Sequence, residues 1–238
     1  MPGPGHPPDD RIPVVPCRVA EDGRFAVVRS EERMADELAA IQEACFPTLS
    51  ASERMRAEHY RAHVLVFPEG QHAVVETATG RVVAASTDFR TTIDFHHYQH
   101  RYIDAVAGNW LSHHQPAGDW LYGADIGVHP DFRRRGLATL LYEERQGLCR
   151  RLGLAGHVEG AMPNGYHRHR EAMAIEAYVS RVVRGELDDP TLSVQLHRGY
   201  HVYGLSPDYL EDPSCANYGV FVVWRNSDRR GPPLPSAR

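Results

Sequence analysis

The stretch of the chain that decides its fold is Asp125-Ile126-Gly127-Val128-His129-Pro130-Asp131-Phe132-Arg133-Arg134-Arg135-Gly136-Leu137-Ala138. It overlaps an apolar run over 120–128 that is typical of a β-strand, and Pro130 ends this strand because proline has no N–H for a sheet. Leucines then recur at helical spacing over 136–152, which predicts an amphipathic helix. The expected inward side chains are Trp120, Tyr122, Ala124, Ile126 and Val128 on one face of the strand, and Leu137, Leu140, Leu141, Leu148 and Leu152 on the helix.

The turn between this strand and this helix has the features of an anion-binding site. The first N–H groups of a helix have no partner within the helix, and the helix dipole adds positive potential there. Gly136 has no Cβ to keep a large anion from the backbone, and Ala138 is small. The guanidinium groups of Arg133, Arg134 and Arg135 suit phosphate oxygens. The turn therefore predicts a pyrophosphate site, and its pattern is neither a Walker loop nor the dinucleotide-binding G-x-G-x-x-G.

Composition excludes several classes of protein and partner. The 238 residues are 42% hydrophobic and 24% charged, as in soluble globular proteins. All 26 basic residues are arginine and the net charge is −5, which argues against a broad nucleic-acid-binding surface. No apolar run approaches the roughly 18 residues of a membrane span, and the N-terminus lacks a signal-peptide pattern. We therefore expect a cytoplasmic protein with no nucleic-acid or membrane partner.

The spacing of cysteine and histidine does not indicate a metal site. Histidines cluster at 96–100, 113–114 and 167–169, but adjacent histidines on a loop seldom converge on one ion. We therefore expect no metal cofactor, while a histidine of the segment 94–115 stays a candidate base or substrate contact. The four cysteines stand singly, without a C-x-x-C pair, and are expected to pack or to lie on the surface as reduced thiols: Cys17, Cys45, Cys149 and Cys215.

One substantial domain is expected between two short tails. Residues 1–22 and 227–238 are rich in proline or glycine and are predicted to be flexible tails. Residues 23–226 are enough for one α/β domain. The other elements expected in it are strands over 25–28, 71–76, 82–87, 155–161 and 218–224, helices over 31–46, 52–64, 169–184 and 190–198, and a mixed loop and helix insertion over 89–119.

One pattern in the deciding stretch resembles motif A of the GNAT acetyltransferase superfamily: V-x-P-x-x-R-x-x-G-x-A, carried by Val128, Pro130, Arg133, Gly136 and Ala138. The resemblance implies an α/β fold with a mixed, twisted central sheet that is flanked by helices and splays open between two parallel strands. It also implies acetyl-CoA as co-substrate in the splay. The pantetheine arm would lie along Ile126, Gly127 and Val128, and the pyrophosphate on the amides of Arg134, Arg135, Gly136, Leu137 and Ala138.

Further segments resemble a GNAT subgroup that is often fused to a nitrilase-type carbon–nitrogen hydrolase. They lie between residues 24 and 226, and no segment of the 238 residues resembles the hydrolase. A separate amidohydrolase partner and a homodimer both stay open. The segments are Cys45-Phe46-Pro47-Thr48-Leu49-Ser50, His59-Tyr60-Arg61, Phe67-Pro68-Glu69-Gly70-Gln71, Asp119-Trp120-Leu121-Tyr122-Gly123, Asp189-Pro190-Thr191-Leu192-Ser193-Val194-Gln195-Leu196, Tyr209-Leu210 and Trp224-Arg225-Asn226.

Acetyl transfer to an amine needs a base for the amine and gains from an acid for the leaving thiolate. Asp125, a carboxylate in an apolar strand at the mouth of the expected cleft, is the candidate base or a structural hydrogen-bond partner. The resemblance implies that Tyr122 stands where some members have a catalytic Glu, so its hydroxyl either donates or simply packs. It also implies that Gln195 stands where many members have a tyrosine that acts as the general acid. Tyr166 is then another candidate acid, and release of the free thiolate is the alternative.

Three functions stay open on the sequence, of which the third is that of a phosphate-binding fold unrelated to CoA. The first is an acetyl-CoA-dependent N-acetyltransferase that transfers acetyl directly to a small-molecule or protein amine, without a cysteine nucleophile. The second is a non-catalytic acyl-CoA-binding module that acts with a nitrilase-type amidohydrolase. The unmatched positions of Tyr122 and Gln195 keep this second function open.

Overall fold

The computed structural model describes residues 15–229 together with 234 and 235. It contains the predicted strand and helix as β5 (Trp120–Val128) and α4 (Leu137–Arg151), joined by a turn that includes one 3-10 turn at Pro130–Phe132. The other strands are β1 (Pro16–Val19), β2 (Phe25–Arg29), β3 (Gln71–Glu76), β4 (Val82–Thr91), β6 (Gly156–Ala161), β7 (His201–Ser206) and β8 (Gly219–Arg225), and the other helices are α1 (Ala35–Cys45), α2 (Ala57–Val66), α3 (Tyr102–Ala105), α5 (Ile175–Val183) and α6 (Leu192–His197).

The eight strands form one mixed sheet in the order β1-β2-β3-β4-β5-β6-β8-β7. Neighbouring strands are antiparallel except for β5 and β6, which run parallel. Their pairing stops at Gly123 and Glu159, while β5 continues alone on that side to Val128. The sheet therefore splays open beside the second half of β5, as the family resemblance implies.

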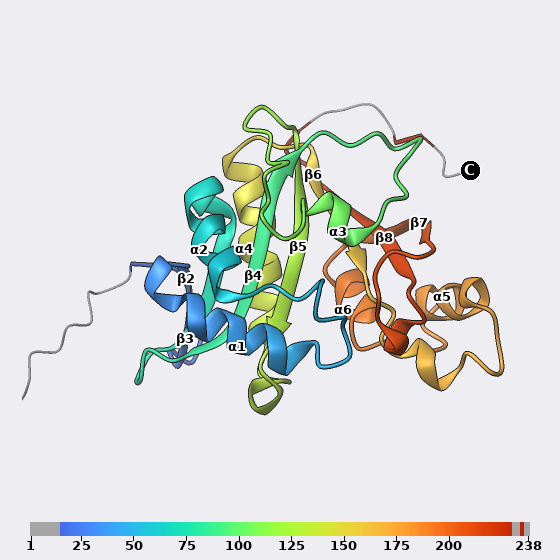
Figure 1. The fold of residues 1–238 in the computed structure, drawn as a ribbon, viewed down its shortest axis with the longest axis horizontal. Coiled ribbons are helices and arrows are strands. Elements are labelled where there is room, and N and C mark those ends of the chain that lie inside the picture. Colours follow the sequence, from blue (N-terminus) through green and yellow to red (C-terminus); the bar gives the residue numbers. More distant parts are fainter. Residues whose placement is uncertain (1–14, 230–233, 236–238) are drawn as a thin grey trace, which may run out of the picture.

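Helices cover both faces of the sheet, with α1 and α2 on one face and α4 on the other (Figure 1). Leu38 and Ile41 of α1 belong to a core cluster with side chains of the adjacent sheet face. On the opposite face, Leu137 and Leu141 of α4 pack against valines of β2, β3 and β4. Both clusters are apolar, so the hydrophobic effect fixes α1 and α4 on either side of β5.

A bulge in β5 overturns the prediction that its five apolar side chains share one face. The pairing with β4 shifts so that Thr87 lies opposite Asp125 and Asp88 opposite Gly123, with one extra residue between them. A bulge of one residue reverses which face the following side chains take. Trp120 and Tyr122 accordingly pack on the α1 side, and Ile126 and Val128 pack with the α4 cluster.

Two edge strands were missed by the sequence reasoning. β1 lies inside the predicted tail of residues 1–22, but it pairs with β2 and is part of the sheet. β7 pairs with β8 at the other edge. Most side chains of both strands are at least partly exposed, so no alternation of apolar residues marks them in the sequence. Residues 1–14, 230–233 and 236–238 of the predicted tails lie outside the described residues.

Other boundaries differ from expectation for local reasons. β4 runs on to Thr91, into the segment expected to be a loop insertion. Ala174 has extended backbone angles (φ −67°, ψ 157°), so the helix expected over 169–184 begins only at Ile175. Leu152 stands past the end of α4 and is 37% exposed rather than buried. Among the described residues, we find no helix with both the length and the hydrophobicity needed to cross a bilayer.

Candidate active site

The turn between β5 and α4 leaves the N-terminus of α4 open to a ligand. Gly136 occupies the N-cap position with φ 77°, and no side chain caps the helix. Arg134 also has a positive φ of 60°, which non-glycine residues seldom adopt. A Cβ built on Gly136 would meet no atom within 4 Å. The first N–H groups of α4 are therefore accessible from open space, as an anion site requires.

A cleft of about 1840 Å³, open to solvent, runs past this helix end. Asn164 and Thr191 line its far side, together with Asp188 and Pro190. The cleft thus lies in the splay, between β5, α4 and the chain that leads into α6. Of the residues predicted to bind the co-substrate, the following line it: Ile126, Gly127, Val128, Arg133, Arg134, Gly136, Leu137 and Ala138.

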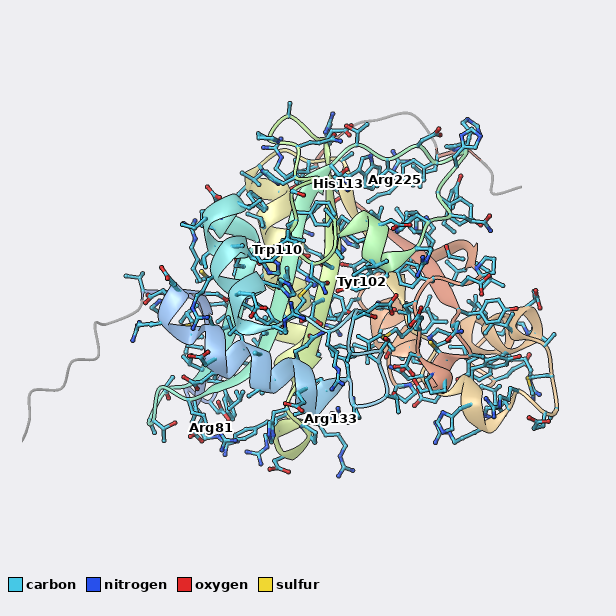
Figure 2. The ribbon with its side chains drawn as sticks, in the orientation of Figure 1. Arg81, Tyr102, Trp110, His113, Arg133 and Arg225 are labelled. Carbon is cyan, nitrogen blue, oxygen red and sulfur yellow. The ribbon has the colours of Figure 1, made fainter. Side chains whose placement is uncertain are left out.

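The three consecutive arginines do not act as one group. Figure 2 shows Arg133 at the turn that follows β5, where its Nε donates to the Val128 carbonyl at 3.2 Å. Arg135 does not line the cleft: its guanidinium donates to the Asp131 carbonyl at 3.1 Å and lies 4.9 Å from the centre of the Phe132 ring. Only Arg133 and Arg134 therefore border the cleft with their positive charge.

A second, smaller space of about 600 Å³ continues the cleft inward. Phe46, Ile126 and Met162 line both spaces, as do Asn164 and Thr191. The inner cavity begins where the pairing of β5 and β6 stops. Its polar lining comes from β5 and β6 on the two sides of the splay, from α1, α3 and α6, and from the loop after β7. It includes Gln42, Tyr102, Asp125, Glu159, Gln195 and Tyr209.

Asp125, the predicted base, lies in this inner cavity and is 9% exposed. Burial raises its pKa to about 7, against the attraction of the Arg145 guanidinium, which lowers it. The Tyr60 hydroxyl donates to Oδ2 at 3.3 Å. The Gln42 amide, in the orientation that satisfies both its ends, brings its nitrogen to 3.0 Å from the same oxygen. A carboxylate with this pKa is partly ionised at neutral pH and can accept a proton.

The two tyrosines proposed from the sequence, Tyr122 and Tyr166, differ in how they are placed relative to the inner cavity. Tyr122 borders neither space, but its hydroxyl oxygen lies 2.9 Å from that of Tyr209, which lines the inner cavity. Tyr166 donates to the Met173 carbonyl at 3.2 Å, packs against Tyr178, and lines neither space. Tyr166 is therefore not placed to protonate a leaving thiolate. Tyr209 is the better-placed phenol, and burial raises its pKa, so it keeps its proton at neutral pH.

Sequence reasoning missed a buried charge network beneath the inner cavity. Arg145 of α4 is fully buried and donates to Asp88 at 3.1 Å and to Glu159 at 3.0 Å, as well as to the carbonyl of Asp125. Gln195 of α6 donates from Nε2 to the other oxygen of Glu159 at 2.9 Å. Arg145 stands four residues after Leu141 and three before Leu148, so the helical period places it on the apolar side of α4. A charged residue on that side is the sequence signal that could have revealed the network.

Two further possibilities, a cysteine nucleophile and a metal site, can be judged from the residues that would form them. Cys45 borders the outer cleft, but burial raises the pKa of its thiol to about 12, so it is not a thiolate nucleophile at neutral pH. Among the described residues, ligand atoms of Cys17, His72 and Glu144 lie within 4.8 Å of one another. Arg151 pairs with that Glu144 at 2.5 Å, so its carboxylate already has a cation, and this cluster borders neither space.

Comparisons with known proteins agree with this geometry. Two relatives from Bacillus subtilis (strain 168) match most of the chain. The "Probable hydrolase YhcX" is 32% identical over 85% of the chain, which spans only 39% of that protein. The "Uncharacterized N-acetyltransferase YkwB" is 29% identical over 80% of the chain and 84% of its own length.

A solved structure shares the fold. The GphF GNAT-like decarboxylase in complex with isobutyryl-CoA superposes with a TM-score of 0.69 at 22% identity, over 84% of this chain and 98% of that one. The family model described as "Acetyltransferase (GNAT) family" matches residues 35–169, which is more than half of the chain and includes β5, the arginine turn and α4. The chain belongs to the acetyltransferase (GNAT) family.

Proposed function

We propose that this protein is an acetyl-CoA-dependent N-acetyltransferase that transfers acetyl directly to an amine. The observation that carries the proposal is the continuity of two spaces. The outer cleft borders the uncapped end of α4, and the inner cavity that opens from it contains Asp125 with a pKa of about 7. An anion site and a proton acceptor are thus joined along the splay.

The chain's own residues suit the co-substrate. The open N–H groups of α4, with Arg133 and Arg134, would hold the pyrophosphate of CoA by charge-assisted hydrogen bonds. The edge of β5 beyond Gly123 has no partner on the β6 side, so its backbone can bond to the amides of the pantetheine arm. When bound, acetyl-CoA supplies an acetyl group activated as a thioester.

Asp125 would take one proton from the protonated acceptor amine inside the inner cavity, which leaves a neutral amine with two protons on its nitrogen. The nitrogen then forms a bond with the acetyl carbon as the carbon–sulfur bond breaks, and the thiolate gains the second amine proton. Tyr209 keeps its hydroxyl proton at neutral pH and can donate a hydrogen bond at this stage. A base within hydrogen-bond reach contributes about 10²- to 10⁴-fold to such a step.

The test is release of free thiol from acetyl-CoA in the presence of an amine panel. We expect thiol release to depend on the amine, and acetylated amine to form in equal amount. A suitable panel holds a monoamine, a diamine and a dipeptide with a free N-terminus. Amine-independent release, or none with any amine, would contradict the proposal.

One observation favours a second candidate function. The chain matches a part, 39%, of a protein named as a probable hydrolase. An acyl-CoA-binding module that assists a separate amidohydrolase would bind CoA tightly and release no thiol with any amine. Calorimetric titration with CoA beside the thiol assay separates the two functions.

A further inference from the structure

A row of three hydrogen-bonded side chains leads from the inner cavity toward the surface. Tyr209 lines the cavity, and its hydroxyl oxygen is 2.9 Å from that of Tyr122 on β5. The Tyr122 oxygen is in turn 2.6 Å from Nε2 of His100, which lies in the loop before α3. Both tyrosines are 2% exposed, whereas His100 is only partly buried. The row therefore joins the inner cavity to a group that solvent can reach.

The direction of each hydrogen bond in this row follows from its outer end. Nδ1 of His100 lies 2.6 Å from the carbonyl oxygen of Tyr98, and a carbonyl can only accept, so Nδ1 carries the proton. In a neutral imidazole Nε2 is then an acceptor, and it takes the hydrogen bond from Tyr122. Tyr122 has no second proton, so Tyr209 must donate to it. Every donor in the row thus points away from the cavity.

The surroundings of His100 favour this neutral state. Burial lowers its pKa, while Asp104 of α3 raises it. The other groups packed against the imidazole are Tyr122 of β5, Tyr209 and Phe221 of β8. None of these three is charged at neutral pH, since burial raises the pKa of both tyrosines.

From this geometry we infer that Tyr209, Tyr122 and His100 form a proton relay that removes the proton released by the acceptor amine. The inference rests on the proposed function. Aliphatic amines are mostly protonated at pH 7, so forming an amide and a thiol from an ammonium group releases one net proton. Asp125, itself buried, must lose the proton it has taken before the next turnover.

The relay balances with single proton shifts. A proton leaving the cavity binds to the oxygen of Tyr209, whose own proton passes to Tyr122, and the proton of Tyr122 passes to Nε2 of His100. The imidazolium that results releases one proton to solvent, and Nε2 can accept again once the proton that remains on the ring is on Nδ1. His100 and Tyr122 act through Tyr209 and are positioning residues.

The test compares His100→Gln, His100→Ala and Tyr122→Phe with the unaltered chain in the thiol-release assay. We expect kcat to fall by about 10²-fold in each variant while the affinity for CoA is unchanged. Added imidazole should restore His100→Ala, but not the double variant that also carries Tyr122→Phe. The matched control is His97→Gln in the same loop, because His97 is exposed and bonds only to Asp94 in the described structure.

The outcomes separate the relay from the function on which it rests. If the unaltered chain turns over no amine, the proposed function fails and the relay has no proton to carry. If the unaltered chain is active and His100→Gln matches its kcat, or imidazole restores nothing, the relay alone is overturned. Nitrogen NMR of His100 gives a check without turnover. The Nδ1–H tautomer is expected, and the Nε2–H tautomer would contradict the outward direction of the row.

Discussion

Nε of Arg145 donates to Oδ2 of Asp88 at 3.1 Å, and neither side chain is exposed to solvent. Arg145 is on α4 and Asp88 is on β4, beside the bulge that turns Asp125 into the inner cavity. The same guanidinium also bonds to Glu159 of β6. With its bond to the Asp125 carbonyl of β5, this one side chain ties together β4, β5 and β6, including both strands that border the splay.

Replacement of Arg145 by Met should destabilise the fold strongly. It would leave Asp88 and Glu159 buried without their cation, and breaking a buried ion pair costs about 3–5 kcal/mol. Urea unfolding followed by circular dichroism measures the loss. The control is Arg150→Met, since Arg150 is on the same helix but is 44% exposed and pairs with Asp228 at 3.7 Å. Such surface pairs contribute about 0–1 kcal/mol, so equal losses in the two variants would contradict the role of Arg145.

The turn of residues 128–138 could be predicted from the sequence because its geometry is local. Pro130 and Gly136 impose backbone conformations on their own neighbourhood, and α4 repeats its apolar side chains at a fixed period. The inner cavity could not be predicted in the same way. Asp88 and Gln195 lie 57 and 50 residues from Arg145, and only the folded sheet brings such groups together. The bulge after Gly123 likewise leaves no mark in the alternation of apolar residues.

The choice among tyrosines shows the same limit. Tyr166 begins a short 3-10 helix (Tyr166–Arg168) and Tyr209 lies in the loop after β7, and nothing local in the sequence distinguishes them as candidate acids. Pairing between β6 and β8 sets the position of the loop that carries Tyr209, and that pairing is long-range. The family resemblance included Tyr209 among its segments but assigned it no role.

Gly136→Val should abolish binding of CoA while leaving the protein folded. The new side chain would project into the open space beside the helix end, where the phosphates would approach. Gly153→Val is a matched control at the other end of α4, because Gly153 also has a positive φ and open space around it. Both variants should lose about 1–2 kcal/mol of stability from backbone strain, but only Gly136→Val should show no heat of CoA binding in calorimetry. Equal affinity in the two variants would remove the anion site from this turn.

The pH dependence of the reaction should report Asp125. With a pKa of about 7, its carboxylate becomes ionised, and able to accept a proton, as pH rises through 7, so kcat/KM should fall on the acid side. Asp125→Asn should lose most activity and with it this acid limb. A profile from pH 5.5 to 9 measures both effects. An unchanged limb in Asp125→Asn would assign the titration to another group.

The same carboxyl affects stability in a direction that can be checked separately. Its pKa is higher in the folded chain than its ordinary value of 3.8, so the folded state binds the proton more tightly between about pH 4 and 7. Raising the pH through this window therefore lowers the free energy of unfolding. The measurement is urea unfolding at pH 5 and pH 8. Between these two pH values the free energy of unfolding should fall less in Asp125→Asn than in the unaltered chain.

Cys45→Ala should leave kcat unchanged, although Cys45 borders the outer cleft. The thiol has a pKa of about 12 and packs against Gly127, so it is neither ionised nor needed for direct transfer. Mass spectrometry of the unaltered chain after incubation with acetyl-CoA alone should find no acetyl group on the peptide that contains Cys45. A stable acetyl-cysteine there, together with loss of activity in the variant, would indicate a covalent intermediate instead.

Gln195→Met should weaken binding of the amine. Nε2 of Gln195 is engaged with Glu159, which leaves its buried Oε1 as an acceptor without a partner beside the inner cavity. An amine N–H can satisfy this oxygen, and loss of such a hydrogen bond costs about 1–3 kcal/mol, or roughly a 5- to 150-fold rise in the KM for the amine. The control is Gln146→Met, because Gln146 bonds to the Arg198 carbonyl and borders neither space. A rise confined to kcat, or an equal rise in the control, would show that Gln195 does not contact the acceptor.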